Sequence, residues 1–266
     1  MTLRRRRSGR SWDRDASQLL DYFRTAGYPA SNGYARVVNK TFRRRKLCGE
    51  QSRDYVFYHF AAPDEQQALV NWANPGAFTL TKAGTVTHAA NRGFTPAGGV
   101  NDALTSTFNL STAGVGTNDV SIELYSRTNA VASTQLDWGG AAATTLFGRI
   151  RFTSDVTQVR LTNTAAVASA NGSVTDTTGL FSWLRNSTGV LQACRNGVQV
   201  GSDIAVTDQA LTNQSFNWGN AVVGTNSSST KEMAFARIAQ GMTAARCLEH
   251  YQQAVLPLLQ WNGANV

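Results

Sequence analysis

The side chains that could do acid–base chemistry in this chain are carboxylates set in strand-like sequence. A retaining glycosidase needs two carboxyl groups roughly 5–5.5 Å apart, and alternate residues of one strand would supply them. Glu123, in Ser-Ile-Glu-Leu-Tyr, is alone on its expected strand, and Asp137, in Leu-Asp-Trp-Gly-Gly, is equally isolated. The paired-carboxylate requirement is therefore not met.

Other catalytic and metal-binding patterns are also missing from the sequence. It contains no Gly-x-Ser-x-Gly elbow, no phosphate-binding Gly-x-x-x-x-Gly-Lys and no His-Glu-x-x-His. The three histidines and three cysteines are not spaced as zinc ligands. We expect no enzymatic activity, no cofactor and no metal site.

A binding role has looser requirements, because sugar-binding surfaces combine an aromatic face with a few amide, carboxylate or guanidinium groups. Each candidate also has a structural interpretation: a tryptophan in the sandwich core, solvated strand arginines, or an asparagine in a connecting loop. The candidate glycan-binding residues are Asp137, Trp138, Arg149, Arg185 and Asn226.

The net charge of +8 is confined to the start of the chain. Residues 1–53 hold 14 Lys/Arg against 4 Asp/Glu, whereas the remainder holds 11 against 13. The excess comes largely from two clusters, which could dock on an acidic protein, contact DNA phosphates or remain solvated. The candidate anchoring residues are Arg4, Arg5, Arg6, Arg7, Arg43, Arg44, Arg45 and Lys46.

Helical signals lie at the two ends of the chain. Asp15 and Gln18 have capping-box spacing, which predicts a helix over 15–26 that ends at Gly27. A polar connection is expected through Asn32-Gly33, and a second helix from Pro63-Asp64 to about Asn74. Near the C-terminus, Thr243 caps an amphipathic helix that Pro257 should kink or end.

Between Gly76 and Gly241, Thr, Ser, Asn, Gly and Val dominate, and short strand-like runs alternate with turn signals. Twelve such runs, among them Ala103–Asn109, Val190–Arg195 and Ser215–Trp218, predict a β-sandwich. Asn196-Gly197 predicts a tight hairpin that pairs Cys194 with Gln199. The expected organisation is a basic arm (1–14), a helical and extended anchoring region (15–75), the sandwich (76–241), and a C-terminal helix and tail packed on it (242–266).

Three cysteines, Cys48, Cys194 and Cys247, are too few for a disulfide scaffold. They are either inert thiols or, in an oxidising medium, partners for bonds between subunits. Cys48 follows the second basic cluster, so it is the candidate for an intersubunit disulfide. No stretch approaches the roughly 18 apolar residues of a membrane span, and we expect no membrane insertion.

Three ordered segments resemble a family of bacteriophage structural proteins with a LamG-like, concanavalin A-like jelly-roll domain. The first is Ala68–Gly76 followed by Phe78-Thr-Leu-Thr-Lys and Gly93-Phe94, and the second is Gly179–Ser187 with Arg195-Asn-Gly-Val198. The third is Ala234–Thr243 and the helix after it. The resemblance covers about residues 60–260 and implies a mainly β, jelly-roll sandwich in a virion component.

The resemblance leaves three functions open. The chain could be a structural accessory protein of a virion (tail, neck, fibre or capsid decoration), anchored by its basic N-terminal region and forming a homo-oligomer with other virion proteins around it. Alternatively it is a receptor- or glycan-binding lectin-like module, or a head or neck protein that contacts DNA. Fold analogy alone does not decide between them.

Overall fold

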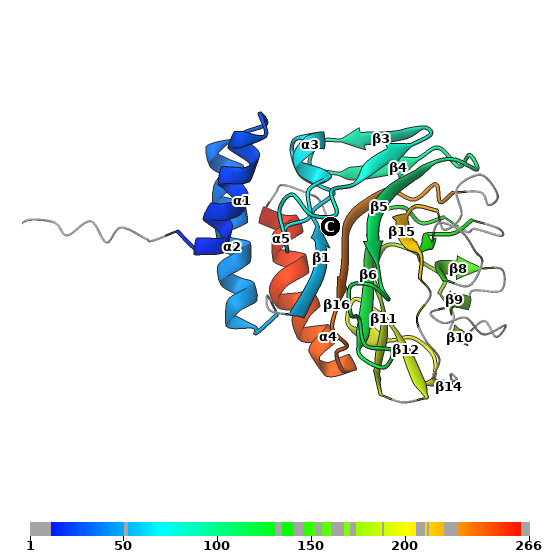
Figure 1. Cartoon of the computed structure of the whole chain (residues 1–266). Helices are drawn as coiled ribbons and strands as arrows, with labels where there is room; N and C mark the ends of the chain where they lie inside the picture. Colours follow the sequence, from blue (N-terminus) through cyan, green and yellow to red (C-terminus); the bar gives the residue numbers. More distant parts are fainter. Residues whose placement is uncertain are drawn as a thin grey trace, which may run out of the picture.

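The chain is a mainly β sandwich of two antiparallel sheets with helices on one side (Figure 1). The computed structural model describes residues 12–50, 53–130, 135–140, 146–152, 156–160, 168–170, 174–187, 189–205, 211, 213–220 and 228–261. The helices are α1 (Arg14–Thr25), α2 (Asn32–Leu47), α3 (Glu65–Ala68), α4 (Ala244–His250), the π-helical η2 (Tyr251–Val255) and α5 (Leu256–Trp261).

Two antiparallel sheets form the sandwich, here called sheet A and sheet B. Sheet A has the order β13-β12-β11-β6-β16-β4-β3, with β1 paired to β16 and β14 to β12, and sheet B has the order β10-β9-β8-β7-β15-β5-β2. The strands of sheet A are β1 (Asp54–Tyr58), β3 (Val86–Ala89), β4 (Gly93–Pro96), β6 (Val120–Ser126), β11 (Gly179–Ser187), β12 (Val190–Arg195), β13 (Val198–Gln199), β14 (Ile204–Ala205) and β16 (Met233–Ala239). Those of sheet B are β2 (Thr81–Ala83), β5 (Ala103–Asn109), β7 (Trp138–Gly140), β8 (Phe147–Phe152), β9 (Val156–Arg160), β10 (Ala168–Ala170) and β15 (Ser215–Trp218).

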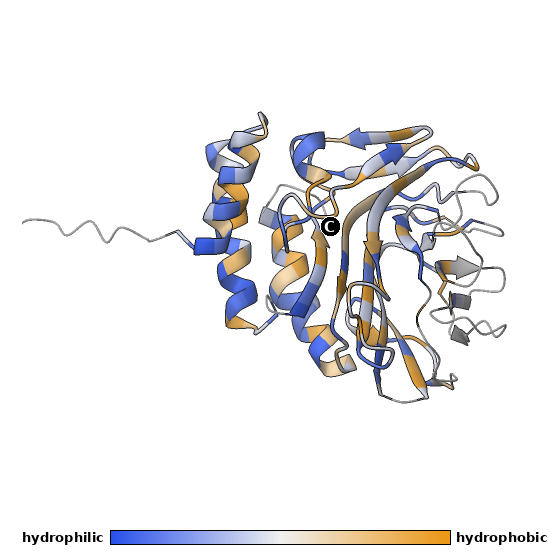
Figure 2. Cartoon of the chain, viewed as in Figure 1, coloured by the Kyte–Doolittle hydropathy of each residue, from blue (hydrophilic) through white to orange (hydrophobic). Residues whose placement is uncertain are grey.

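Sheet A is covered on both faces. Its inner face meets sheet B, while α4, η2 and α5 lie on its outer face, and α1 and α2 form a further layer outside them (Figure 1). All seven residues of β6 and all seven of β16 are consequently buried. Figure 2 shows hydrophilic and hydrophobic residues alternating along α1 and α2, as expected of helices with one buried face.

The predicted sandwich is confirmed, and several strands match closely. β5, β12 and β15 have the predicted bounds, and Cys194 pairs with Gln199 across the Asn196-Gly197 turn as expected. The border expected at residue 76 does not follow the sheets, because β1 joins sheet A beside β16. One hydrophobic cluster takes in side chains from α1, α2 and both sheets.

The helices differ more from expectation. The polar connection expected after Asn32 is wrong: Ser31 caps the 16-residue helix α2, which buries Tyr34, Val38 and Phe42 on one face. Helix α1 is capped by Asp13 and not by Asp15, and α3 is a single turn capped by Asp64. Thr243 caps α4 as predicted.

Pro257 distorts the C-terminal helix in a specific way. It lacks the N–H that would donate to the carbonyl of Gln253 in an α-helix, and the π-helical η2 comes directly before it. The Gln253 carbonyl instead accepts a hydrogen bond from Nε of Arg44 at 2.9 Å. Helix α2 thereby satisfies the backbone group that the proline leaves open.

Candidate functional site

The outer face of sheet B is the open face of the sandwich. Within the described part of the chain, the helices all lie on the opposite side, over sheet A (Figure 1). Hydrogen-bonding side chains point outward in pairs on neighbouring strands. Thr81 Oγ1 and Thr105 Oγ1 are 2.7 Å apart, Asn109 donates to Asn213 at 2.7 Å, and Arg149 donates to Gln158 at 3.2 Å.

The paired side chains of this open face are hydrogen-bond donors and acceptors. Hydroxyl and amide groups both donate and accept hydrogen bonds, as sugar hydroxyls do, and a guanidinium donates several. Thr105 alternates along β5 with the buried Leu104 and Ser106, so its outward direction follows from the pleat. Arg149 is half-buried, and burial lowers the pKa of its guanidinium. A partly desolvated donor of this kind binds an acceptor more strongly than a fully hydrated one.

Asp137 does not lie on this face, which corrects its assignment to a glycan site. Its carboxylate is fully buried. One oxygen accepts from Ser229 at 2.7 Å and from the Lys231 ammonium at 3.0 Å, and the other accepts from the backbone N–H of Ile150 at 2.6 Å. Asp137 ties β8 to the segment that leads into β16, and its role is structural.

Trp138 is likewise a core residue, so its ring has no face to offer a sugar. It is fully buried, stacks on Phe216 with ring centroids 5.4 Å apart and meets Trp183 edge-on at 5.3 Å. Gly148 lies against it, since a Cβ there would come within 2.1 Å of the indole. The structural interpretation of this tryptophan is the correct one.

The other three candidates are separated in the fold. Arg149 lies on the open face of sheet B, whereas Arg185 is buried on β11 of sheet A and cannot meet a ligand there. Asn226 lies outside the described residues. The five candidates therefore do not form one site, and only Arg149 contributes to the open face.

The basic anchoring cluster is used mostly inside the molecule. Arg44 binds Gln253, and the Lys46 ammonium lies 2.8 Å from Asp13 and 3.1 Å from Asp15. Arg45 is fully buried and pairs with Asp54, which excludes it from docking a partner. Arg43 remains exposed. Arg4, Arg5, Arg6 and Arg7 lie outside the described residues.

A buried ionic cluster joins the helices to the outer face of sheet A. At its centre, the Arg237 guanidinium meets three carboxylates: Asp54 at 2.7 Å, Glu50 at 2.8 Å and Glu123 at 3.1 Å. Glu123 also lies 3.1 Å from His250, and Glu50 lies 2.9 Å from Arg246. The groups come from α4, β1, β6, β16 and the segment after α2.

The electrostatics of the cluster favour the charged forms of Glu123 and Glu50. Burial raises the pKa of Glu123, but His250 and Arg237 together outweigh it and lower that pKa to about 2. Burial lowers the pKa of His250, which opposes its protonation. Burial, followed by repulsion from Arg237, lowers the pKa of Arg45 to about 9, and its guanidinium rests 4.0 Å from the Phe57 ring centre. Apart from the partly exposed Arg246, the cluster is buried, and it joins α4 to sheet A.

The cysteines occupy two environments. Cys194 and Cys247 are buried together between β12 and α4, with Leu184 and Met242, and neither forms a disulfide. Cys48 caps the end of α2 and is partly exposed. Burial raises the pKa of the Cys48 thiol. Its predicted bond to another subunit stays a prediction.

No family model matches the chain, and no curated protein matches it. Solved structures share its fold. Botulinum neurotoxin type C, whose cell entry is described as dependent on two ganglioside molecules, aligns with TM-score 0.56 and 12% identity over 77% of this chain and 52% of that one.

Two further structures agree. The binding domain of botulinum neurotoxin DC, solved with rat synaptotagmin II, aligns with TM-score 0.55 and 11% identity over 76% of this chain and 52% of that one. Trypanosoma rangeli sialidase in complex with 2,3-difluorosialic acid aligns with TM-score 0.52 and 8% identity over 82% of this chain and 39% of the sialidase chain. The chain spans about half of the toxin chains, and at these identities the likeness shows the β-sandwich fold alone.

The residues that sequence reasoning missed lie on the outer face of sheet B and in the buried ionic cluster on the outer face of sheet A. Thr105, Gln158 and Asn213 gave no signal, because exposed polar residues are ordinary on a strand. Glu123 and Arg237 did carry one, since each is a lone charge in an otherwise apolar or small-residue strand. A charge in such a setting needs a partner.

Proposed function

We propose that this chain is a receptor-binding module that recognises glycans through the open face of sheet B. The observation that carries the proposal is the polar outer face of sheet B, which no described helix covers. The Arg149–Gln158 pair lies on β8 and β9, and the Thr81–Thr105 pair lies towards the opposite edge. The sandwich fold supports it, and so do structural neighbours that are described as depending on gangliosides, as holding a sialic acid derivative or as receptor-binding domains. No membrane-spanning helix is present among the described residues.

The test uses the full chain on an array of microbial and animal glycans that includes lipopolysaccharide, followed by calorimetry on the best ligand. Losing a charged hydrogen bond costs about 1.5–3 kcal/mol, so Arg149→Ala should weaken binding roughly 10- to 150-fold. Gln158→Ala should weaken it less. The matched control is Arg24→Ala, an exposed arginine on α1. Array silence, or affinity unchanged in Arg149→Ala, would refute the proposal.

We further propose that the module is carried on a bacteriophage particle. Its support is the sequence resemblance of three ordered segments to phage structural proteins. A structural accessory role, with the sandwich packed between copies, is the second candidate that the same resemblance favours. Mass spectrometry of purified particles whose genome encodes the chain tests the location. If the chain is present but no glycan binds, the accessory role is retained, and absence from the particles removes both virion proposals.

A further inference from the structure

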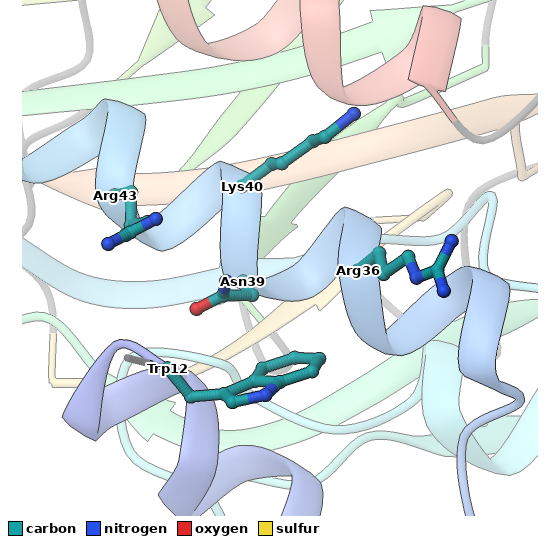
Figure 3. Close-up of a pocket in the computed structure, with 5 residues that line it drawn as sticks. All are labelled: Trp12, Arg36, Asn39, Lys40 and Arg43. Atoms are coloured by element: carbon teal, nitrogen blue, oxygen red, sulfur yellow. The ribbon is translucent and has the colours of Figure 1, made fainter. Parts of the chain in front are cut away.

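A second surface lies on the opposite side of the molecule, between the start of α1 and the outer side of α2. It is a hollow of about 390 Å³ lined by Trp12, Arg36, Asn39, Lys40 and Arg43 (Figure 3). A neighbouring hollow of about 460 Å³ is lined by Asp13, Arg43, Lys46 and Leu47. Because both share Arg43, they form one groove along α2, here called the α2 groove.

The groove is strongly cationic. Arg36, Lys40 and Arg43 follow one another at i, i+4 and i+7, which places them on one face of α2 over about 10 Å. Among the described residues, no carboxylate pairs with any of the three, in contrast to Arg45 and Lys46 further along the helix. The Lys40 ammonium lies 5.4 Å from the centre of the Trp261 ring, so Arg36 and Arg43 are the cations that can attract an anionic partner.

Trp12 supplies an aromatic surface within this charge. It is 48% exposed, whereas the sandwich tryptophans Trp72, Trp138, Trp183 and Trp218 are buried. Figure 3 shows its ring across the hollow from α2, facing Asn39, with Arg36 and Arg43 on either side. The Oδ1 of Asn39 accepts from the backbone N–H of Asp13 at 2.8 Å, which orients the amide and leaves its Nδ2 as a donor.

We propose that the α2 groove binds single-stranded nucleic acid. Surfaces that bind single strands combine cations that follow the phosphates with aromatic rings on which bases stack. Here Arg36 and Arg43 would contact phosphates, and Trp12 would stack on an unpaired base. A duplex offers no unpaired base to the ring. Two adjoining hollows that share a cation fit an extended polyanion better than a single acidic sugar.

The proposal lies beyond the receptor-binding function and is independent of it, because the groove and the open face of sheet B are on opposite sides (Figure 1). Neither basic cluster, Arg4–Arg7 or Arg43–Lys46, contains an aromatic residue. The fold brings Trp12 to a basic helix face that begins 24 residues later in the chain. Trp12 and the basic face of α2 are therefore brought together by tertiary structure.

The experiment titrates the full chain into fluorescein-labelled dT12 and follows anisotropy at several salt concentrations. Base stacking is worth about 1–3 kcal/mol, so Trp12→Ala should weaken binding roughly 5- to 150-fold. Arg36→Ser/Arg43→Ser should weaken it further and make the dependence of log K on log salt shallower by about 1.4, or 0.7 per phosphate contact. Arg24→Ser is the matched control and should bind like the wild type.

Competition separates nucleic acid from other anions. A polyglutamate of equal charge and duplex DNA should both compete more weakly than unlabelled dT12. The absence of dT12 binding would overturn the proposal. So would wild-type affinity in Trp12→Ala, or polyglutamate competing as well as dT12, which would indicate an acidic protein partner. Circular dichroism of each variant confirms folding, and all the substituted side chains lie at the surface.

Discussion

Replacing Arg237 with methionine tests the buried ionic cluster most directly. Methionine keeps much of the volume and the hydrophobic stem but removes the charge that three carboxylates share. Asp54 retains Arg45 and Glu50 retains Arg246, but Glu123 is left with His250, whose pKa is itself lowered by burial. Arg237→Met therefore leaves Glu123 as a poorly compensated buried charge.

Breaking a buried ion pair by removing one partner costs about 3–5 kcal/mol. At about 2–4 °C per kcal/mol for a chain of this size, the melting temperature should fall by roughly 6–20 °C. Urea unfolding followed by circular dichroism at pH 7.5 measures the loss. Arg92→Met is the matched control, because Arg92 forms an exposed ion pair with Glu232 and should cost about 0–1 kcal/mol.

Two further measurements test whether the loss of stability in Arg237→Met comes from the uncompensated charge of Glu123. Arg237→Met/Glu123→Gln removes both the arginine and the stranded charge, so it should be more stable than the sum of the single variants implies. In Arg237→Met the pKa of Glu123 should rise, so acidification neutralises that charge and the deficit should shrink from pH 7.5 to pH 5. A loss below about 1 kcal/mol, or strictly additive variants, would refute the role assigned to the cluster.

Three other outcomes are expected. Burial lowers the pKa of His59 to about 3, so on acidification the unfolded state binds a proton at a higher pH than the folded state does. The free energy of unfolding should therefore fall by about 2 kcal/mol from pH 7.5 to pH 5, and His59→Gln should reduce this fall in thermal melts. Gly148→Ala should destabilise by about 1–3 kcal/mol in urea unfolding, because its Cβ meets Trp138, while Gly114→Ala, at an open turn, should not create such a clash. In purified particles alkylated before denaturation, Cys48 should give a disulfide-linked ladder on non-reducing gels that Cys48→Ser abolishes, and monomer alone would remove the intersubunit bond.

The sandwich could be predicted from the sequence because its signals are local. Turn residues separate short strand-like runs, and the Asn196-Gly197 hairpin sets its own register. Helix α2 also had a local signal, since Tyr34, Val37, Val38, Thr41, Phe42 and Arg45 follow helical spacing. Asn32-Gly33 predicts a polar connection, whereas both residues lie in the first turn of α2. The helical spacing of the apolar residues was the stronger of these two signals, and the Asn-Gly pair was given too much weight.

The sites were less accessible to sequence reasoning because they depend on distant pairs. Asp137 looked isolated on its strand, yet its partner Lys231 lies 94 residues later. Trp138 had two interpretations that differ only in which face of sheet B it points from, and a one-residue change of register exchanges those faces. Periodicity places a residue on a strand, but the partner strand decides what it meets.

The basic residues of α2 have two roles, which the sequence alone does not distinguish. On one side of α2, Arg44 satisfies a carbonyl that Pro257 leaves open, and Arg45 neutralises Asp54 in the buried cluster. On the other side, Arg36 and Arg43 face solvent beside Trp12. Charge reversal on the two sides should therefore separate the effects: inward changes should unfold the helical layer, whereas outward changes should leave it folded and alter only what the groove binds.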